Sequence, residues 1–122
     1  MIRRLRTVLL ASAAALVFLP GIAFAQVGNI AGTVRDTQGG VLPGVTVEVS
    51  SPQLIEKVRS TVTDGNGRYQ IVSLPAGRYK VTFRLEKFAT VERTNIELGS
   101  DFTASVNADM KLGAQTEVVT EI

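Results

Sequence analysis

The apolar residues of this chain recur at every second position, in short runs. Residues 45–50 alternate three valines with Thr46, Glu48 and Ser50, and residues 79–86 alternate Tyr, Val, Phe and Leu with Lys, Thr, Arg and Glu. Successive side chains of a strand point to opposite faces, so this period of two is typical of a strand with one buried face. The pattern predicts an all-β chain with little helix.

Clusters of turn-forming residues separate these runs. Glycine supplies positive φ, proline presets φ, and Asp and Asn bond to the neighbouring backbone. About seven short strands at regular spacing between such turns are typical of an antiparallel β-sandwich. The residues that we assign to structural turns are Pro43, Gly44, Asp64, Gly65, Gly67, Pro75 and Gly77.

The alternation also predicts which side chains face inward. Pro43 and Pro52 flank the run of valines, so that strand is either an edge strand or has its prolines just outside the ladder. The residues that we expect on the inner faces are Ile30, Gly32, Val34, Val45, Val47, Val49, Val58, Val62, Tyr69, Ile71, Tyr79, Val81, Phe83, Leu85, Val91, Ile96, Leu98, Phe102, Ala104, Val106, Ala108, Met110 and Leu112.

Residues 1–25 have the organisation of a secretory signal peptide. A basic head with Arg3, Arg4 and Arg6 precedes an apolar run over residues 8–19, and small residues precede a cleavage point between Ala25 and Gln26. The run is shorter than the roughly 20 apolar residues that a membrane-spanning helix needs, which disfavours the alternative of an uncleaved anchor. The leader predicts export to the periplasm or outer membrane, with no transmembrane segment after cleavage.

The charge of the chain gives no argument for nucleic acid. The full chain has 13 Lys and Arg against 11 Asp and Glu, and loss of the leader's three arginines leaves 10 against 11. Nucleic-acid binding needs clustered cations, and the remaining charges are interspersed. We therefore expect no nucleic-acid partner.

Catalytic and metal-binding chemistry has few candidates. The chain contains no His and no Cys, which removes Ser-His-Asp and Cys-His nucleophiles and the usual zinc ligand sets. Glu92 with Glu97, or Glu48 with Glu56, could be imagined as acid and base, but solvated strand faces explain them better. The sequence predicts no catalytic residue, no metal site and no cofactor, and hence no enzyme.

The segment that begins at Asp64 matches the first residues of the calcium-binding loop pattern. That loop needs Gly at its sixth position and a bidentate Glu at its twelfth, which here are Tyr69 and Pro75. A hairpin turn is the better interpretation, because Asp-Gly and Asn-Gly are strong hairpin signals.

A carbohydrate site would need an exposed aromatic platform. Trp is absent, and the candidates are Tyr69, Tyr79 and Phe88. Both tyrosines have inward parity, so core positions are favoured over sugar contacts.

Four segments in order resemble the carboxypeptidase regulatory-like family: Gly-Thr-Val-Arg-Asp at 32–36, Pro-Gly-Val-Thr-Val at 43–47, Thr-Asp-Gly-Asn-Gly-Arg-Tyr at 63–69 and Leu-Pro-Ala-Gly-Arg-Tyr-Lys-Val at 74–81. The resemblance covers residues 29–112 and makes 26–112 one domain. It implies a transthyretin-like (prealbumin-type), Greek-key sandwich, grouped with starch-binding-like folds. It also implies a non-catalytic interaction module, with a carbohydrate-binding module as the alternative. The family usually has a glycine before the aromatic residue that follows the fifth strand, whereas this chain has Lys87 before Phe88.

Residues 113–122 form a tail of different character. The β-prone residues Thr116, Glu117, Val118, Val119 and Thr120 are similar to a stretch between the sandwich and the plug of Oar-like TonB-dependent outer-membrane receptors. That resemblance implies strand addition to an energy-coupling periplasmic protein. It also predicts a further domain beyond the tail. A free β-prone segment is an aggregation hazard, so we expect the tail to be covered.

Overall fold

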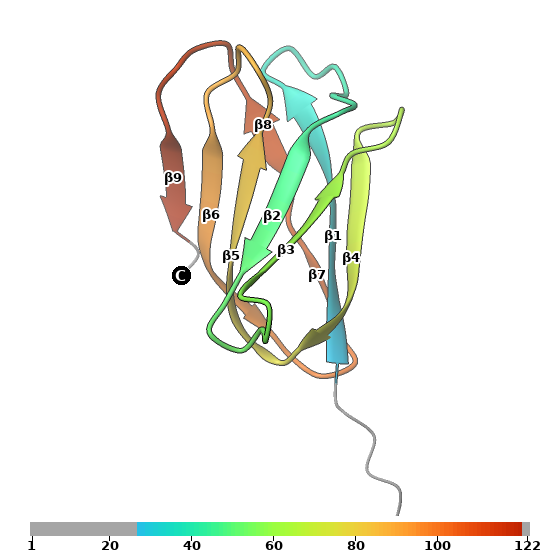
Figure 1. Ribbon diagram of the computed structural model, residues 1–122. Coiled ribbons are helices and arrows are strands. Elements are labelled where there is room, and N and C mark those ends of the chain that lie inside the picture. Colours follow the sequence, from blue (N-terminus) through green and yellow to red (C-terminus); the bar gives the residue numbers. More distant parts are fainter. Residues whose placement is uncertain (1–26, 121–122) are drawn as a thin grey trace, which may run out of the picture.

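The computed structural model describes residues 27–120, which form two β-sheets packed face to face (Figure 1). The predicted all-β sandwich is confirmed. The leader and the proposed cleavage point at Ala25 and Gln26 lie outside the described residues. The strands are β1 (Val27–Asp36), β2 (Thr46–Ser50), β3 (Val58–Val62), β4 (Arg68–Pro75), β5 (Gly77–Arg84), β6 (Val91–Leu98), β7 (Thr103–Ser105), β8 (Ala108–Met110) and β9 (Glu117–Thr120).

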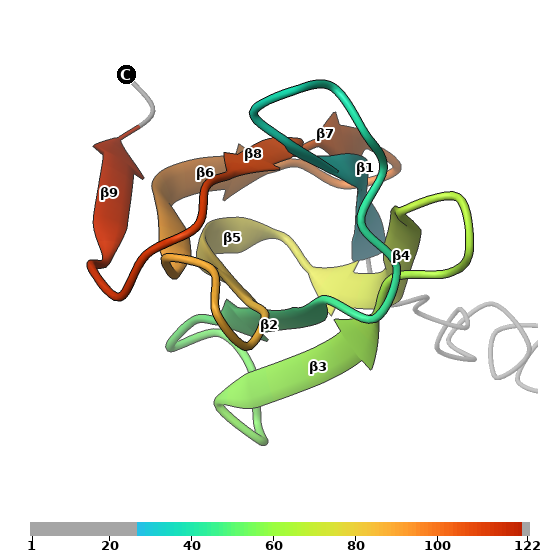
Figure 2. The same ribbon diagram turned by 90° about the horizontal axis from the view of Figure 1, so that it is seen from above.

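One sheet has the order β4-β1-β7, with β8 also paired to β1, and the other has the order β3-β2-β5-β6-β9. Pairs between β1 and β4 and among β2, β3, β5 and β6 are antiparallel, as expected. In addition, β7 and β8 run parallel to β1, and β9 runs parallel to β6. Seen from above, the two sheets enclose the core, and β9 extends the second sheet beyond β6 (Figure 2). Within residues 27–120, no helix has the length and apolar character to cross a bilayer.

The core lies between the sheets and draws residues from strands β1, β2 and β4 to β8. Ile30, Leu74, Tyr79, Phe83 and Met110 are among its largest fully buried side chains. The rings of Tyr69 and Phe83 meet edge to face, with centroids 5.7 Å apart and planes at 76°. Edge-to-face packing places the positive ring edge against the negative face of its neighbour, so this pair links the two sheets favourably.

Two bulges change the parity of the buried residues. In β4 the buried positions shift from Tyr69 and Ile71 to Leu74, and in β6 they shift from Val91 to Ile96 and Leu98. Each shift coincides with one extra residue in the ladder. Ser73 (φ 58°) and Asn95 (φ 63°) supply the left-handed conformation there. A bulge lets a strand bend and still return its apolar residues to the core.

The inward assignment of Val58 and Val62 was wrong. Their side chains are 48% and 57% exposed, and Arg59 takes the inward side of this edge strand instead. The Arg59 guanidinium donates from Nη1 to the carbonyls of Val72 (2.7 Å) and Ser73 (3.3 Å) at the β4 bulge. The bulge leaves these carbonyls outside the regular ladder, so a cation between the sheets stabilises them better than a valine would.

Phe102 and Leu112 were also wrongly placed in the core, since they are 54% and 72% exposed. Both lie just outside β7 and β8, where strand alternation no longer sets the side-chain direction. The prolines that flank β2 lie outside its ladder, and β2 is an interior strand between β3 and β5.

The turn residues have local roles in the structure. The Asp64 carboxylate accepts from the backbone N–H groups of Asn66 (2.8 Å) and Arg68 (3.0 Å), which closes the β3–β4 turn. Gly44 and Gly67 have positive φ, and Pro75 and Gly77 form the junction of β4 and β5. Lys87 replaces the glycine of the family pattern and adopts φ 75°. The turn is thus kept, with backbone strain because this left-handed conformation is unfavourable for a residue other than glycine.

Between β7 and β8 the chain passes very close to β1 at Gly32. A Cβ on Gly32 would lie 1.9 Å from the carbonyl oxygen of Val106. Val106 donates its N–H to the carbonyl of Ala31 (2.9 Å), and the Asn107 side chain accepts from the Thr33 N–H (2.9 Å). Arg93 on the other sheet donates to the Asn107 carbonyl (2.6 Å). These contacts fix the β7–β8 connection against both sheets.

We expect Gly32→Ala to destabilise the domain by at least about 2 kcal/mol, because the added methyl group meets backbone that cannot move without breaking these hydrogen bonds. Urea unfolding monitored by circular dichroism measures the change. Gly65→Ala is the matched control, since nothing lies within 4 Å of its added Cβ. Equal stability of the two variants would contradict this account of the crossing.

Candidate functional site

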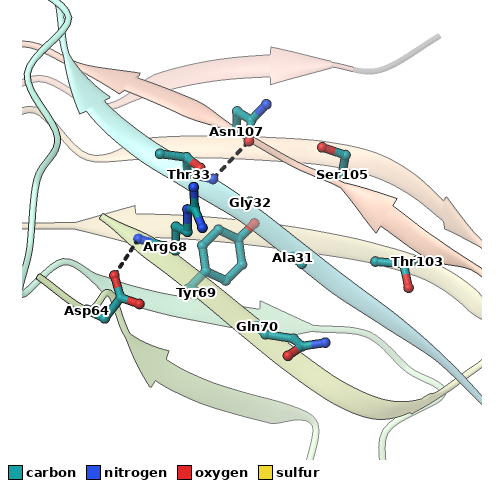
Figure 3. Close-up of a pocket in the computed structure, with 10 residues that line it drawn as sticks. All are labelled: Ala31, Gly32, Thr33, Asp64, Arg68, Tyr69, Gln70, Thr103, Ser105 and Asn107. Carbon is teal, nitrogen blue, oxygen red and sulfur yellow. Dashed lines mark hydrogen bonds between the residues drawn. The ribbon is translucent and has the colours of Figure 1, made fainter. Parts of the chain in front are cut away.

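A shallow groove of about 620 Å³ lies on the outer face of the β4-β1-β7 sheet. Figure 3 shows its lining, which comes from β1, β4, β7 and the turns beside them. Half of the lining side chains are short and polar. The residues are Ala31, Gly32, Thr33, Asp64, Arg68, Tyr69, Gln70, Thr103, Ser105 and Asn107.

The groove has little that could catalyse a reaction. The carboxylate of Asp64 is engaged by its own turn, and the Asn107 side chain is engaged by the Thr33 N–H (Figure 3). Arg68 is the remaining ionisable side chain of the lining besides Tyr69. General acid–base work needs a group free to transfer a proton within reach of a substrate. The lining contains no His or Cys, and its one carboxylate is engaged by its own turn.

The two tyrosines named as sugar candidates are core residues. Tyr69 is 5% exposed and donates its hydroxyl to the Val106 carbonyl (2.5 Å), and Tyr79 is 1% exposed and donates to the Pro75 carbonyl. Burial raises the pKa of both phenols, since removal from water penalises the phenolate. The Tyr69 hydroxyl binds a carbonyl of the β7–β8 connection, and the Tyr79 hydroxyl binds one at the β4–β5 junction. Both tyrosines therefore stabilise the packing of the sandwich.

Phe88 is partly buried and packs against the core, next to an isolated bridge with Leu112. With both tyrosines buried, the three residues do not form one exposed platform. The prominent exposed aromatic among the described residues is instead Phe102. The alternation of apolar residues predicts an inward Phe102, so no local pattern indicates this exposure.

Three of the four carboxylates considered as acid–base pairs, Glu48, Glu56 and Glu97, have arginine partners. Glu56 and Arg59 form an ion pair at 2.8 Å, and the hydrogen bond from Arg59 lowers the pKa of Glu56. Glu97 pairs with Arg78 at 2.8 Å, and Glu48 pairs with Arg84. Glu48 and Glu56 thus have separate partners. Among residues 27–120, no group of three or more acidic, His or Cys side chains could hold a metal ion.

The tail segment forms an ordered strand on the domain itself. β9 pairs with β6 in parallel, with Glu117 opposite Val91 and Thr120 opposite Thr94. The Glu117 N–H donates to the Thr90 carbonyl (2.7 Å), and the Glu117 carboxylate pairs with Lys111 (2.5 Å). Val118 and Val119 remain 59% and 44% exposed. One edge of the segment is thus covered by the β6 strand of the same chain, which the sequence alone did not indicate.

Comparison with known proteins assigns the family. A sequence model of the carboxypeptidase regulatory-like domain matches residues 29–111. The chain is 39% identical over 98 residues to the TonB-dependent transporter Oar of Myxococcus xanthus. That match covers 80% of this chain and 9% of the transporter, so the chain spans a small part of its relative's length.

Solved structures share the fold. The Bacillus anthracis TIE protein aligns with a TM-score of 0.59 at 20% identity, over 71% of this chain and 17% of that one. A chain of a type II cohesin–X-dockerin complex from Acetivibrio cellulolyticus aligns with a TM-score of 0.55 at 26% identity, over 70% and 58% of the two chains.

Tyr69→Phe removes the hydrogen bond to the Val106 carbonyl and leaves that buried acceptor unpaired. We expect a loss of about 1–2 kcal/mol in the free energy of unfolding at neutral pH. The phenol's pKa is raised in the folded state, so its contribution is complete below the unfolded pKa of about 10 and declines above it. The difference between wild type and variant should therefore shrink above pH 10, as measured by urea unfolding across pH 7–11. A constant difference would contradict this assignment.

Proposed function

The chain belongs to the carboxypeptidase regulatory-like domain family, and from this membership we propose that it is a non-catalytic interaction domain of the cell envelope. The proposed setting is the periplasmic, N-terminal part of a TonB-dependent outer-membrane receptor or a related surface protein. The observation that carries the proposal is the identity of 39% to the transporter Oar over 98 residues. Such a long alignment extends beyond the turn motifs that any sandwich of this type would share.

The surface chemistry supports a binding role. Most of the carboxylates that could have acted as acid or base have arginine partners, and half of the side chains that line the groove on the β4-β1-β7 sheet are short and polar. A rigid sandwich with exposed strand edges recognises partners by backbone hydrogen bonds instead. The carbohydrate-binding alternative receives no support from Tyr69 and Tyr79, whose rings are buried.

The proposed binding element is the tail, residues 116–120, and the proposed partner is a periplasmic energy-coupling protein of the TonB type. The tail has β-branched residues, exposed valines and no proline, which favours pairing with the edge of another sheet. Main-chain hydrogen bonds would supply the affinity, and the alternating side chains would supply the specificity.

Deletion of residues 116–122 should weaken binding of the purified periplasmic domain of the same organism's TonB-type protein by at least tenfold, or about 1.4 kcal/mol. Isothermal titration calorimetry measures this. The fold should survive, because β9 contributes no residue to the buried core. Phe102→Ser, which removes an exposed apolar group from another surface, is the matched control and should bind normally. Unchanged binding by the tailless protein would rule out strand addition through the tail.

Export has its own test. Expressed with its leader in a Gram-negative host, the protein should be recovered outside the cytoplasm with Gln26 as its first residue, because small residues precede the Ala25–Gln26 bond. Intact-mass measurement of the fractionated protein checks this. Ala25→Arg should block processing and leave the longer form, whereas a cytoplasmic, uncleaved wild type would refute the assignment.

A further inference from the structure

The tail strand β9 is held by few interactions. It pairs over four residues with one neighbour, in parallel, and parallel ladders are slightly less stable per residue than antiparallel ones. None of its side chains is buried. Among residues 27–120, the side-chain interactions at this edge include the Lys111–Glu117 ion pair, a hydrogen bond between the hydroxyls of Thr94 and Thr120 (3.2 Å) and one from the Thr94 hydroxyl to the Val119 carbonyl (3.5 Å), all at exposed positions. Exposed ion pairs contribute at most about 1 kcal/mol.

The strand β6, whose edge pairs with β9, is itself held firmly in the sandwich. β6 pairs with β5 on its other side and anchors Val91, Ile96 and Leu98 in the core. Loss of β9 would therefore expose one edge of β6 and leave the sandwich intact. Local opening of this kind has a free energy well below that of global unfolding.

We infer that the β6 edge is a strand-binding site for the chain's own tail, and that it competes for residues 117–120 with the partner's sheet. This inference rests on the proposed role of the tail. In the closed form β9 lies on β6. In the open form the segment is free on both edges and can enter the partner's sheet. The partner's apparent affinity is then reduced by the fraction of molecules that are closed.

The ladder geometry identifies substitutions that act on β6 alone. Because the Glu117 N–H donates to the Thr90 carbonyl, alternation directs the backbone groups of Thr90, Glu92 and Thr94 toward β9 and those of Val91 and Arg93 toward β5. Glu92→Pro therefore removes an N–H that serves the β9 ladder and leaves the tail sequence unchanged. Glu92→Ala keeps the N–H and is the matched control.

The same register allows the closed form to be locked. Glu92 and Val118 are direct partners in the β6–β9 ladder. Neighbouring strands lie about 4.8 Å apart, within the Cα separation that a disulfide accepts. The chain contains no cysteine, so Glu92→Cys with Val118→Cys introduces the one bond that can form. Both side chains point away from the core, and the reduced protein has an identical sequence to the locked one.

Binding of the TonB-type periplasmic domain is the first readout. Glu92→Pro should bind about three- to tenfold more tightly than wild type, and Glu92→Ala should bind as wild type does, since one ladder hydrogen bond is lost only in the former. The oxidised double-cysteine protein should bind at least tenfold more weakly than wild type, with recovery on reduction. Equal binding by the oxidised and reduced forms, in a protein whose tail deletion abolishes binding, would overturn the competition and leave the proposed function standing.

Hydrogen exchange of the intact chain is the second readout and needs no partner. The amides of Glu117 and Val119, which alternation directs toward β6, should exchange at least 100-fold faster than those of β5, and faster still in Glu92→Pro. In the oxidised double-cysteine protein they should slow. Exchange of the tail as slow as that of Val81 in β5 would overturn the inference, whatever the TonB-type domain does. Thermal unfolding of each variant verifies that the sandwich itself remains folded.

Discussion

The close crossing of the β7–β8 connection over β1 is the constraint on which the rest of this structure depends. The Val106 carbonyl lies so near Gly32 that no side chain fits between them, and the Tyr69 hydroxyl donates a hydrogen bond to the same carbonyl. Arg93 extends the contact to the second sheet. The C-terminal strands β7 and β8 can therefore run parallel to β1 and close the core.

Because the core is closed in this way, any binding partner of the domain must contact its outer surfaces. Side-chain chemistry is sparse on these surfaces, because several of the carboxylates are paired with arginines and the tyrosine hydroxyls serve backbone carbonyls. Backbone hydrogen bonding at strand edges is available, together with exposed apolar side chains such as Phe102 and Val118. The chain is 39% identical over 98 residues to a TonB-dependent transporter, and under the function that we propose the edge strand β9 is the binding element.

Much of the fold followed from local rules, and the errors have definite physical causes. Alternation placed Val45, Val47 and Val49 correctly, because β2 is an interior strand whose one face is wholly buried. It failed for Val58 and Val62, because β3 is an edge strand and the unpaired carbonyls of the β4 bulge attract Arg59. The bulges themselves could not be derived from the local pattern. Ser73 and Asn95 adopt a left-handed backbone conformation that non-glycine residues rarely take, and it persists because the surrounding strand pairing imposes it.

The sequence by itself determined the all-β class, the family, most of the core and the positions of the main turns, because side-chain period and turn chemistry act over a few neighbouring residues. Tertiary structure alone decided which strands run parallel, why Gly32 must be glycine, and where residues 117–120 lie. Those features depend on groups far apart in the chain, such as Thr90 with Glu117 and Gly32 with Val106, whose meeting no local pattern encodes.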